Sequence, residues 1–310
     1  MLKIFKGIES YKSHRGACVT TGTFDGVHIG HRVILKRLSE MAQQSDLESV
    51  MVTFDPHPRK VLFPTQTGLR LLNTIEERLE RLESCGIDAV IVQPFTLDFS
   101  RTSALIYVRD LLVGKVGMKK LVIGYDHQFG KNREGSIEQL RELAPLYGFD
   151  INEIPAQDID DVKISSTKIR NALEQGDIQT ANAYLDYCFN FSGIVVEGDQ
   201  RGRKLGFPTA NIEVENPDKI IPKEGVYAVM VEFGDQKHFG MLNIGRNPTF
   251  DDIRHGRIEV HLFDFNKNLY GQKLKINFHA RMRDEFKFDN ADALVEQLKK
   301  DEKQARSILI

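Results

Sequence analysis

The first 186 residues alternate between two hydrophobic patterns. Short apolar runs, typical of strands buried on both faces of a sheet, are separated by stretches in which apolar residues recur at helical spacing. The stretches that begin at Thr74 and Ser136 open with capping sequences and end near Gly86 and Gly148. Alternating strands and helices predict a parallel sheet covered by helices on both faces. The predicted strands are residues 17–22, 48–54, 88–93, 119–124 and 149–154.

The pattern changes after residues 165–186, which are predicted to be helical. Strand-like runs then follow one another without helices, and residues 273–280 alternate between apolar and polar side chains. This alternation predicts an antiparallel sheet or a small barrel. Apolar residues at near-helical spacing after Asp289 predict a final helix that covers the barrel, and a domain boundary is expected near residue 187. The predicted strands are residues 226–233, 238–244, 257–265 and 273–280.

Length and composition fit a globular protein of two domains. The chain has 310 residues, of which 41% are hydrophobic and 28% are charged. No apolar run approaches the roughly 18 residues of a membrane helix, so no membrane span is expected. The N-terminus lacks the apolar core of a signal peptide, and Cys18, Cys85 and Cys188 have no metal-ligand spacing. We therefore expect reduced thiols and a cytoplasmic protein.

Charge is nearly balanced in both halves of the chain. With histidines counted as neutral, residues 1–186 carry a net charge of −2 and residues 187–310 carry none. Binding to a nucleic-acid backbone usually requires a basic excess on the binding domain. The charge pattern therefore argues against a nucleic-acid partner.

Two histidines bracket the turn between the first predicted strand and the helix that follows it. His28 and His31 lie three residues apart, with Gly22, Gly26 and Gly30 around them. A helix start offers unpaired N–H groups and a positive dipole end, which suit phosphate, and imidazoles add further donors. The pair therefore indicates a phosphate-binding turn. The alternative interpretation is that one histidine caps the helix and the other is an ordinary surface residue.

Other polar loops follow the predicted strands directly. They are TFDPHP at residues 53–58 and GYDHQFG at residues 124–130, and loops of this kind meet at the edge of a parallel sheet where ligands bind. The chain lacks both the dinucleotide-binding glycine pattern and the motif G-x-x-x-x-G-K-[ST]. A second phosphate-binding candidate is ISSTKIR, residues 164–170, for which a plain serine helix cap with solvated basic residues is the alternative. Its hydroxyls and cations are Ser165, Ser166, Thr167, Lys168 and Arg170.

Residues 198–211, GDQRGRKLGFPTAN, carry candidate chemistry of the second half. Glycine and arginine dominate the first part, where backbone N–H groups can approach phosphates closely. Thr209 and Asn211 then offer neutral oxygens. Mg²⁺ prefers oxygen ligands and keeps water and phosphate in the rest of its shell. A basic hairpin loop is the alternative interpretation of the glycine-rich part.

Glu259 lies on the predicted strand 257–265. Because Ile258, Val260 and Leu262 share one face of that strand, Glu259 points to the other face. A carboxylate fixed on a strand can accept a proton from a hydroxyl group. The alternative is a solvated surface acid.

The histidine pair HIGH and the downstream SSTKIR resemble the nucleotidyltransferase superfamily, and TFDPHPRKVLFP resembles the flavin-side loop of bacterial FAD synthetases. The resemblance implies a Rossmann-like α/β domain in which His28 and His31 hold the ATP phosphates while FMN attacks the α-phosphorus and pyrophosphate leaves. Asp126 stands where many of these enzymes carry asparagine. The implied ATP-binding residues are Gly22, Phe24, Gly26, His28, His31, Ser165, Ser166, Thr167 and Arg170, and the implied FMN-binding residues are Phe54, His57, Pro58 and Asp126.

The second half resembles riboflavin kinase in GDQRGRKLGFPTAN, EGVYAV, NIGRNPTF and RMRDEFKF. The resemblance implies an antiparallel six-stranded β-barrel with a C-terminal helix. In that barrel Glu259 would be the general base on the ribityl 5′-hydroxyl, and Arg283 would lie near the flavin. The implied ATP-binding residues are Gly198, Gly202, Arg203, Gly206, Pro208, Thr209 and Asn211, of which Thr209 and Asn211 would also hold Mg²⁺.

Together the two resemblances cover nearly the whole chain, in the order found in bifunctional bacterial riboflavin kinase/FAD synthetases. They imply an FMN adenylyltransferase domain at residues 1–186 and a riboflavin kinase domain at residues 187–310. The implied partners are ATP with Mg²⁺, riboflavin, FMN, FAD and pyrophosphate, without nucleic acid or membrane. Two alternatives stay open: an enzyme that transfers a nucleotide to another phosphate and has a regulatory second half, and a non-catalytic flavin-binding or nucleic-acid-binding barrel protein.

Overall fold

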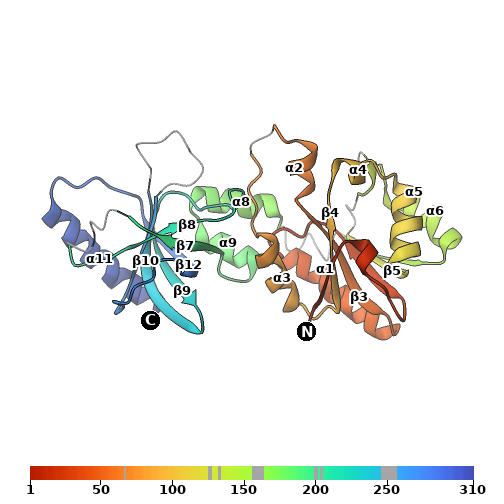
Figure 1. Cartoon of the computed structure of the whole chain (residues 1–310), viewed down its shortest axis with the longest axis horizontal. Coiled ribbons are helices and arrows are strands. Elements are labelled where there is room, and N and C mark those ends of the chain that lie inside the picture. The colour runs from red at the N-terminus through yellow and green to blue at the C-terminus, as the bar shows by residue number, and fades with distance from the viewer. Residues whose placement is uncertain are drawn as a thin grey trace. The chain divides into compact units, whose positions relative to one another are not determined.

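We describe the protein from a computed structural model of the whole chain (Figure 1). The chain separates by its contacts into two compact units, which are Met1–Leu69 with Asn73–Ser165, and Arg70–Leu72 with Ser166–Ile310. The structure describes residues 1–65, 68–124, 128–131, 134–155, 164–198, 202, 205–245 and 257–310.

A parallel sheet forms the centre of the first unit. In its described residues the strands lie in the order β1-β4-β3-β2-β5-β6, and every neighbouring pair is parallel. The predicted strands are confirmed, whereas β1 was not predicted. The chain proceeds from β2 through β3 to β4 on one side and reaches β5 and β6 on the other, so the order reverses between β2 and β5. The strands are β1 (Lys3–Lys6), β2 (Ala17–Thr21), β3 (Glu48–Asp55), β4 (Ala89–Pro94), β5 (Met118–Gly124) and β6 (Asp150–Ile154).

Helices cover both faces of this sheet, as predicted. Successive strand residues face opposite sides, so Cys18 packs with residues of α1 and α3, while Val19 packs with residues of η2 and α6. Thr74 forms the expected reciprocal capping box with Glu77 at the start of α3. The elements are η1 (Ile8–Ser10), α1 (Ile29–Gln44), α2 (Pro58–Leu62), α3 (Ile75–Glu83), α4 (Leu97–Ser100), α5 (Ala104–Ile106), the π-helix η2 (Tyr107–Lys115) and α6 (Ile137–Tyr147).

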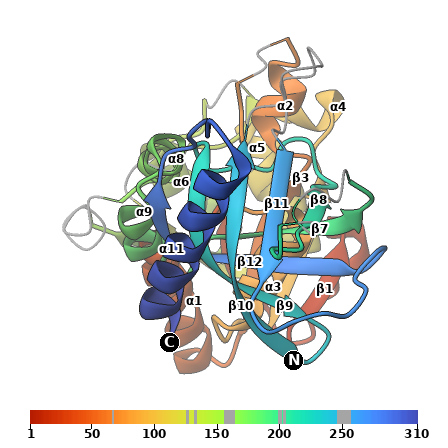
Figure 2. The ribbon, with the colours of Figure 1, turned by 90° about the vertical axis from the view of Figure 1, so that its left-hand side faces the viewer.

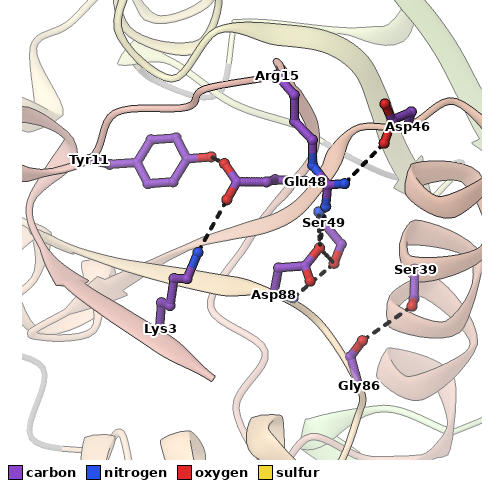
Figure 3. Close-up of polar contacts among 9 residues, drawn as sticks. All are labelled: Lys3, Tyr11, Arg15, Ser39, Asp46, Glu48, Ser49, Gly86 and Asp88. Atoms are coloured by element: carbon purple, nitrogen blue, oxygen red, sulfur yellow. Dashed lines mark hydrogen bonds and ion pairs between the residues drawn. The ribbon is translucent and has the colours of Figure 1, made fainter. Parts of the chain in front are cut away.

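A polar network closes the amino-terminal edge of the sheet (Figure 3). The buried Tyr11 hydroxyl donates to Oε2 of Glu48 at 2.8 Å, and Nζ of Lys3 lies 3.5 Å from Oε1 of the same carboxylate. Beside them Asp88 accepts the backbone N–H and the hydroxyl of Ser49, both at 2.8 Å. Because the strands are parallel, this network lies at the edge opposite the polar loops singled out by the sequence.

A closed antiparallel barrel forms the centre of the second unit, as predicted. In the described residues its strands follow the order β10-β11-β8-β7-β12-β9. Helix α11 packs against β9, β10 and β12. Figure 2 shows this helix in front of the barrel. Strands β7 and β8 were not predicted. The elements are α8 (Ser166–Gln175), α9 (Ile178–Leu185), β7 (Asn190–Val196), β8 (Ala210–Glu213), β9 (Gly225–Phe233), β10 (Gln236–Gly245), β11 (Arg257–Leu262), β12 (Lys273–Arg283) and α11 (Ala291–Leu309).

Segments that precede residue 187 complete the second unit. In α9 the Asn182 side chain donates to the backbone oxygen of Phe278 at 2.8 Å, which ties that helix to β12. Residues Arg70–Leu72 pair with the segment before β9, where Leu71 forms a parallel bridge with Lys219. The assignment of the two activities to segments divided at residue 187 stays a prediction. No helix among the described residues is long and apolar enough to cross a membrane.

Candidate active sites

The first candidate site is built on the loop after β2, at the carboxyl edge of the sheet beside the reversal of strand order. His28 is the N-cap of α1, and its Nδ1 accepts the backbone N–H of His31 at 3.4 Å. The two imidazole rings stack, with centroids 3.6 Å apart and planes at 17°. The capping role that was the alternative interpretation is therefore present. It holds the two rings together as one polar group at the helix start.

The backbone of this loop is strained. Phe24 and Val27 have positive φ angles of 46° and 38°, which are rare for residues with these side chains, and Gly26 lies at 91°. Each such non-glycine residue costs roughly 1–3 kcal/mol, so the surroundings must hold it in place. The Phe24 ring packs against the His31 ring, with the two ring centroids 4.8 Å apart. The Phe24 ring also leaves no room for a side chain at Gly22, because a Cβ added there would lie 2.8 Å from the nearest ring atom.

The predicted flavin-side residues lie at the carboxyl end of β3, the neighbour of β2 in the sheet. His57 is buried and caps α2, since its Nδ1 accepts the backbone N–H of Arg59 at 3.2 Å, and Pro58 is the first residue of that helix. The ring of Phe54 packs against those of Phe95 and Phe99, at centroid distances of 5.6 and 5.9 Å.

Phe95 and Phe99 extend this aromatic surface and were not singled out by the sequence. They follow β4, two strands away from β2 in the sheet, so only the folded chain brings them to Phe54. Asp126 lies outside the described residues.

The serine-rich element divides between the two units. Ser165 is the last residue of the first unit, while Ser166 and Thr167 begin α8 in the second. Arg170 also lies on α8, where its Nε–H donates to the backbone oxygen of Arg70 at 2.6 Å. This contact belongs to the second unit, and the expected role of the element over the ATP phosphates stays a prediction.

The second candidate site lies on paired strands of the barrel. Asn211 of β8 stands opposite Glu259 of β11 in the antiparallel register. The Thr209 hydroxyl donates to Oε1 of Glu259 at 3.4 Å, and Nη2 of Arg257 lies 2.9 Å from the same oxygen. The structure therefore brings together the predicted base and both predicted metal-side residues. Among the described residues no group of three or more histidine, cysteine or acidic side chains is placed to hold a metal.

The described residues of the glycine-rich segment pack closely around this cluster. A Cβ at Gly198 would lie 2.0 Å from the Asn211 side chain, so only glycine leaves that amide in its place. The backbone oxygen of Gly202 accepts the N–H groups of Leu205 and Phe207, at 3.0 and 2.9 Å, and these bonds form the turn that leads to Pro208. Gly206 has a φ of 82° within this turn. Arg203 lies outside the described residues.

A cavity of about 570 Å³ adjoins Thr209. The segment after β11 forms one wall. The strand predicted over residues 257–265 extends into this segment, whereas the cavity itself was not indicated by the sequence patterns. His261 was also missed, although its Nδ1–H donates to the backbone oxygen of Pro208 at 2.8 Å and fixes the residue before Thr209. Residues lining the cavity include Pro208, Thr209, Val260, Leu262, Phe265 and Tyr270.

Arg283 has a structural partner. Its guanidinium donates to both oxygens of the buried Asp301 on α11, at distances from 2.6 to 3.1 Å. The guanidinium also lies 5.3 Å from the centroid of the Phe286 ring. This pair fastens the end of β12 to α11, and the expected place of Arg283 near the flavin stays a prediction.

Two family models match the chain, one in each half. The sequence model of FAD synthetase matches residues 10–168, and that of riboflavin kinase matches residues 185–309. The bifunctional riboflavin kinase/FMN adenylyltransferase of Listeria monocytogenes is 39% identical over 286 residues, covering 92% of this chain and 90% of the relative. The enzyme of the same name from Escherichia coli (strain K12) is 37% identical over 308 residues, covering 98% and 97%.

A solved structure has the same fold over almost the whole chain. It is described as a macrolide-efflux protein from Streptococcus pneumoniae, is 31% identical, covers 98% of each chain and superposes with a TM-score of 0.88. The family matches, together with the shared fold, define a transferase that uses ATP. The chain belongs to the family of bifunctional riboflavin kinase/FMN adenylyltransferases, and it has both of these activities.

Proposed function

We propose that each unit carries one of the two activities at the site described for it. The supporting observation is that the two predicted clusters lie in different units, with His28 and His31 in the first and Thr209 and Glu259 in the second. The strand-paired cluster phosphorylates riboflavin. The loop after β2 transfers an adenylyl group to the FMN so formed.

In the kinase step, Glu259 accepts the proton of the ribityl 5′-hydroxyl as that oxygen bonds to the γ-phosphorus of ATP and ADP leaves. The cavity beside Thr209 has a volume in the range of small-molecule sites, and its partly apolar lining suits the base and ribose of ATP. Thr209 and Asn211 offer neutral oxygens that fit Mg²⁺, which would neutralise charge on the ATP phosphates. Arg257 lies near enough to orient the Glu259 carboxylate.

In the adenylyl step, an FMN phosphate oxygen bonds to the α-phosphorus of ATP, and the bond to the β-phosphate oxygen breaks to release pyrophosphate. The attacking oxygen is already ionised, so no general base is required. His28, His31 and the start of α1 supply donors for oxygens on which charge develops. Phe54, with Phe95 and Phe99, offers an aromatic surface for the flavin ring at the adjacent strand end.

The test is to assay both half-reactions on full-length variants of each site. Riboflavin with Mg·ATP reports the kinase, and supplied FMN with Mg·ATP reports the adenylyltransferase. The proposal requires Glu259→Gln to lose only the first reaction and His28→Ala only the second. Loss of both reactions in either variant at unchanged folding would contradict it.

A further inference from the structure

We propose that Arg78, a buried arginine on α3, is a positioning residue that sets the loop carrying His28 and His31 for adenylyl transfer. The inference rests on the proposed assignment of that loop to the ATP phosphates. Arg78 is 1% exposed, so its guanidinium reaches no substrate. It acts instead through hydrogen bonds to two strand ends.

A chain of hydrogen bonds leads from Arg78 to the loop. Nη1 of Arg78 donates to Oγ1 of Thr53 at 3.1 Å, and the Thr53 hydroxyl donates to the backbone oxygen of Thr23 at 3.3 Å. The same Nη1 donates to the backbone oxygen of Phe54 at 3.3 Å. One guanidinium therefore fixes both the loop after β2 and the end of β3, on which the FMN-side residues lie. Bonds arranged in such a chain strengthen one another in a buried site.

A second tether joins the loop to the start of the same helix. Oδ1 of Asp25, which is 1% exposed, accepts the backbone N–H of Asn73 at 3.0 Å. Asn73 directly precedes the capping box that begins α3. Burial lowers the pKa of Arg78, and the nearby charge of Asp25 is the strongest influence in the opposite direction. The loop residue Asp25 thus contributes to keeping the buried guanidinium charged.

These tethers lie where the backbone is strained. Phe24 and Val27, both at positive φ, flank Asp25 in the sequence, one directly and one across Gly26. A strained loop keeps one conformation only where its surroundings over-determine it. The Nε–H of Arg78 has no acceptor among the described residues, and a buried charge of this kind is seldom the most stable choice for a core position. The arrangement therefore indicates that Arg78 serves to hold the loop in one accurate position, not to stabilise the core.

The test uses Arg78→Met in the full-length protein, with Arg141→Met as the matched control. Arg141 lies on α6 in the same unit and forms an exposed pair with Glu153. We expect the kcat of FAD formation from FMN to fall about 100-fold in Arg78→Met, because a small misplacement of catalytic groups has an effect of that size. We expect smaller changes in KM, while riboflavin phosphorylation and the control stay within about twofold of wild type.

Thr53→Val decides the matter if Arg78→Met does not fold, because it removes only the bridging hydroxyl and keeps the side-chain shape. We expect a loss of about fivefold in the same kcat per folded molecule, together with a moderately lowered melting temperature because two buried groups lose their partner. A purely structural Arg78 would lower the melting temperature and leave kcat per folded molecule unchanged in both variants, and that result overturns the proposal.

His28→Ala, assayed in parallel, separates this inference from the proposed function. If His28→Ala keeps normal FAD synthesis, the loop is not the adenylyl site and both proposals fail. If His28→Ala loses FAD synthesis while Thr53→Val and folded Arg78→Met keep it, only the positioning role fails.

Discussion

The two units place their candidate chemistry on different parts of the backbone. In the first unit the histidine pair sits on a strained loop at the carboxyl end of a parallel strand. In the second unit Asn211 and Glu259 face each other within the register of an antiparallel barrel. Strand pairing fixes the second arrangement through backbone hydrogen bonds, whereas the first needs tethers from a neighbouring helix.

This difference suggests how each site fails. A site whose residues are fixed by strand pairing should lose activity mainly when the reacting group itself is removed. A site on a loop should also lose activity when a residue that holds the loop in place from outside is removed, as proposed for Arg78.

The largest expected effect is that of Glu259→Gln. General-base assistance is typically worth about 10²–10⁴ in rate, so we expect FMN formation to fall by that factor. FAD formation from supplied FMN should stay close to wild type. Glu213→Gln, an exposed acid on β8, is the matched control. Equal damage to both reactions would indicate misfolding or a wrong assignment of the base.

His28→Ala and His31→Ala should each lower FAD formation strongly and leave riboflavin phosphorylation nearly intact. Removing one donor to developing charge typically costs about 10²–10³ in kcat, so the loss should exceed any change in the KM for FMN. The exposed His14→Ala is the control. If the histidines only cap the helix and pack, each variant will lose about 1 kcal/mol of stability and melt at a lower temperature, but it will make FAD normally.

Lys219→Met tests how far the second unit depends on the segment Arg70–Leu72. Lys219 is 1% exposed, and its Nζ donates to the backbone oxygen of Leu72 at 2.6 Å. Methionine keeps the length of the side chain but leaves that buried oxygen without its donor, which typically costs about 1–3 kcal/mol. We therefore expect the kinase to inactivate at a lower temperature than in the exposed control Lys237→Met. Unchanged inactivation would show that the segment contributes little to the second unit.

Alkaline pH should reveal a smaller difference between the units. Burial raises the pKa of Tyr107 in the first unit and of Tyr227 in the second to about 12, and it raises the pKa of Tyr11 in the first unit as well. A raised pKa means that the folded protein holds the tyrosine proton more tightly than the unfolded chain does. Each tyrosine therefore makes its full contribution to the free energy of unfolding below the unfolded-state pKa of about 10. That contribution is lost as the pH rises through the folded-state pKa.

We expect each of these tyrosines to remove roughly 1 kcal/mol of stability by pH 11. The first unit should then weaken more steeply than the second, because it holds two of the three. Chemical unfolding at pH 8 and pH 11, followed through the inactivation of each half-reaction, measures this. Tyr107→Phe should make the stability of the first unit fall less steeply with pH. Equal slopes in wild type would contradict the expectation.

Much of the fold could be predicted because long apolar runs and capping sequences are local signals. The missed strands are short or carry a mixed pattern: β1 spans KIFK, and β8 lies within the PTAN segment that was interpreted for its chemistry. Closure of the barrel depends on pairing between distant residues, which no local pattern records.

The candidate sites divide in the same way. His28, Thr209 and Glu259 could be singled out because their residue types and spacings are unusual. Arg78 could not, since it looks like an ordinary helix residue until the fold buries it against Thr53, 25 positions away. The wall formed by Phe265 and Tyr270 likewise becomes part of a cavity only when β11 pairs with β8.

The central claim is that two separate sites act in turn on one flavin, and a mixing experiment tests it most directly. Full-length His28→Ala and Glu259→Gln are supplied with riboflavin and Mg·ATP, separately and together, and FAD formation is followed. Neither variant alone should convert riboflavin efficiently to FAD, whereas the mixture should, because the first makes FMN and the second adenylylates it. The account is contradicted if the mixture makes no more FAD than the variants do alone, or if either variant alone matches wild type.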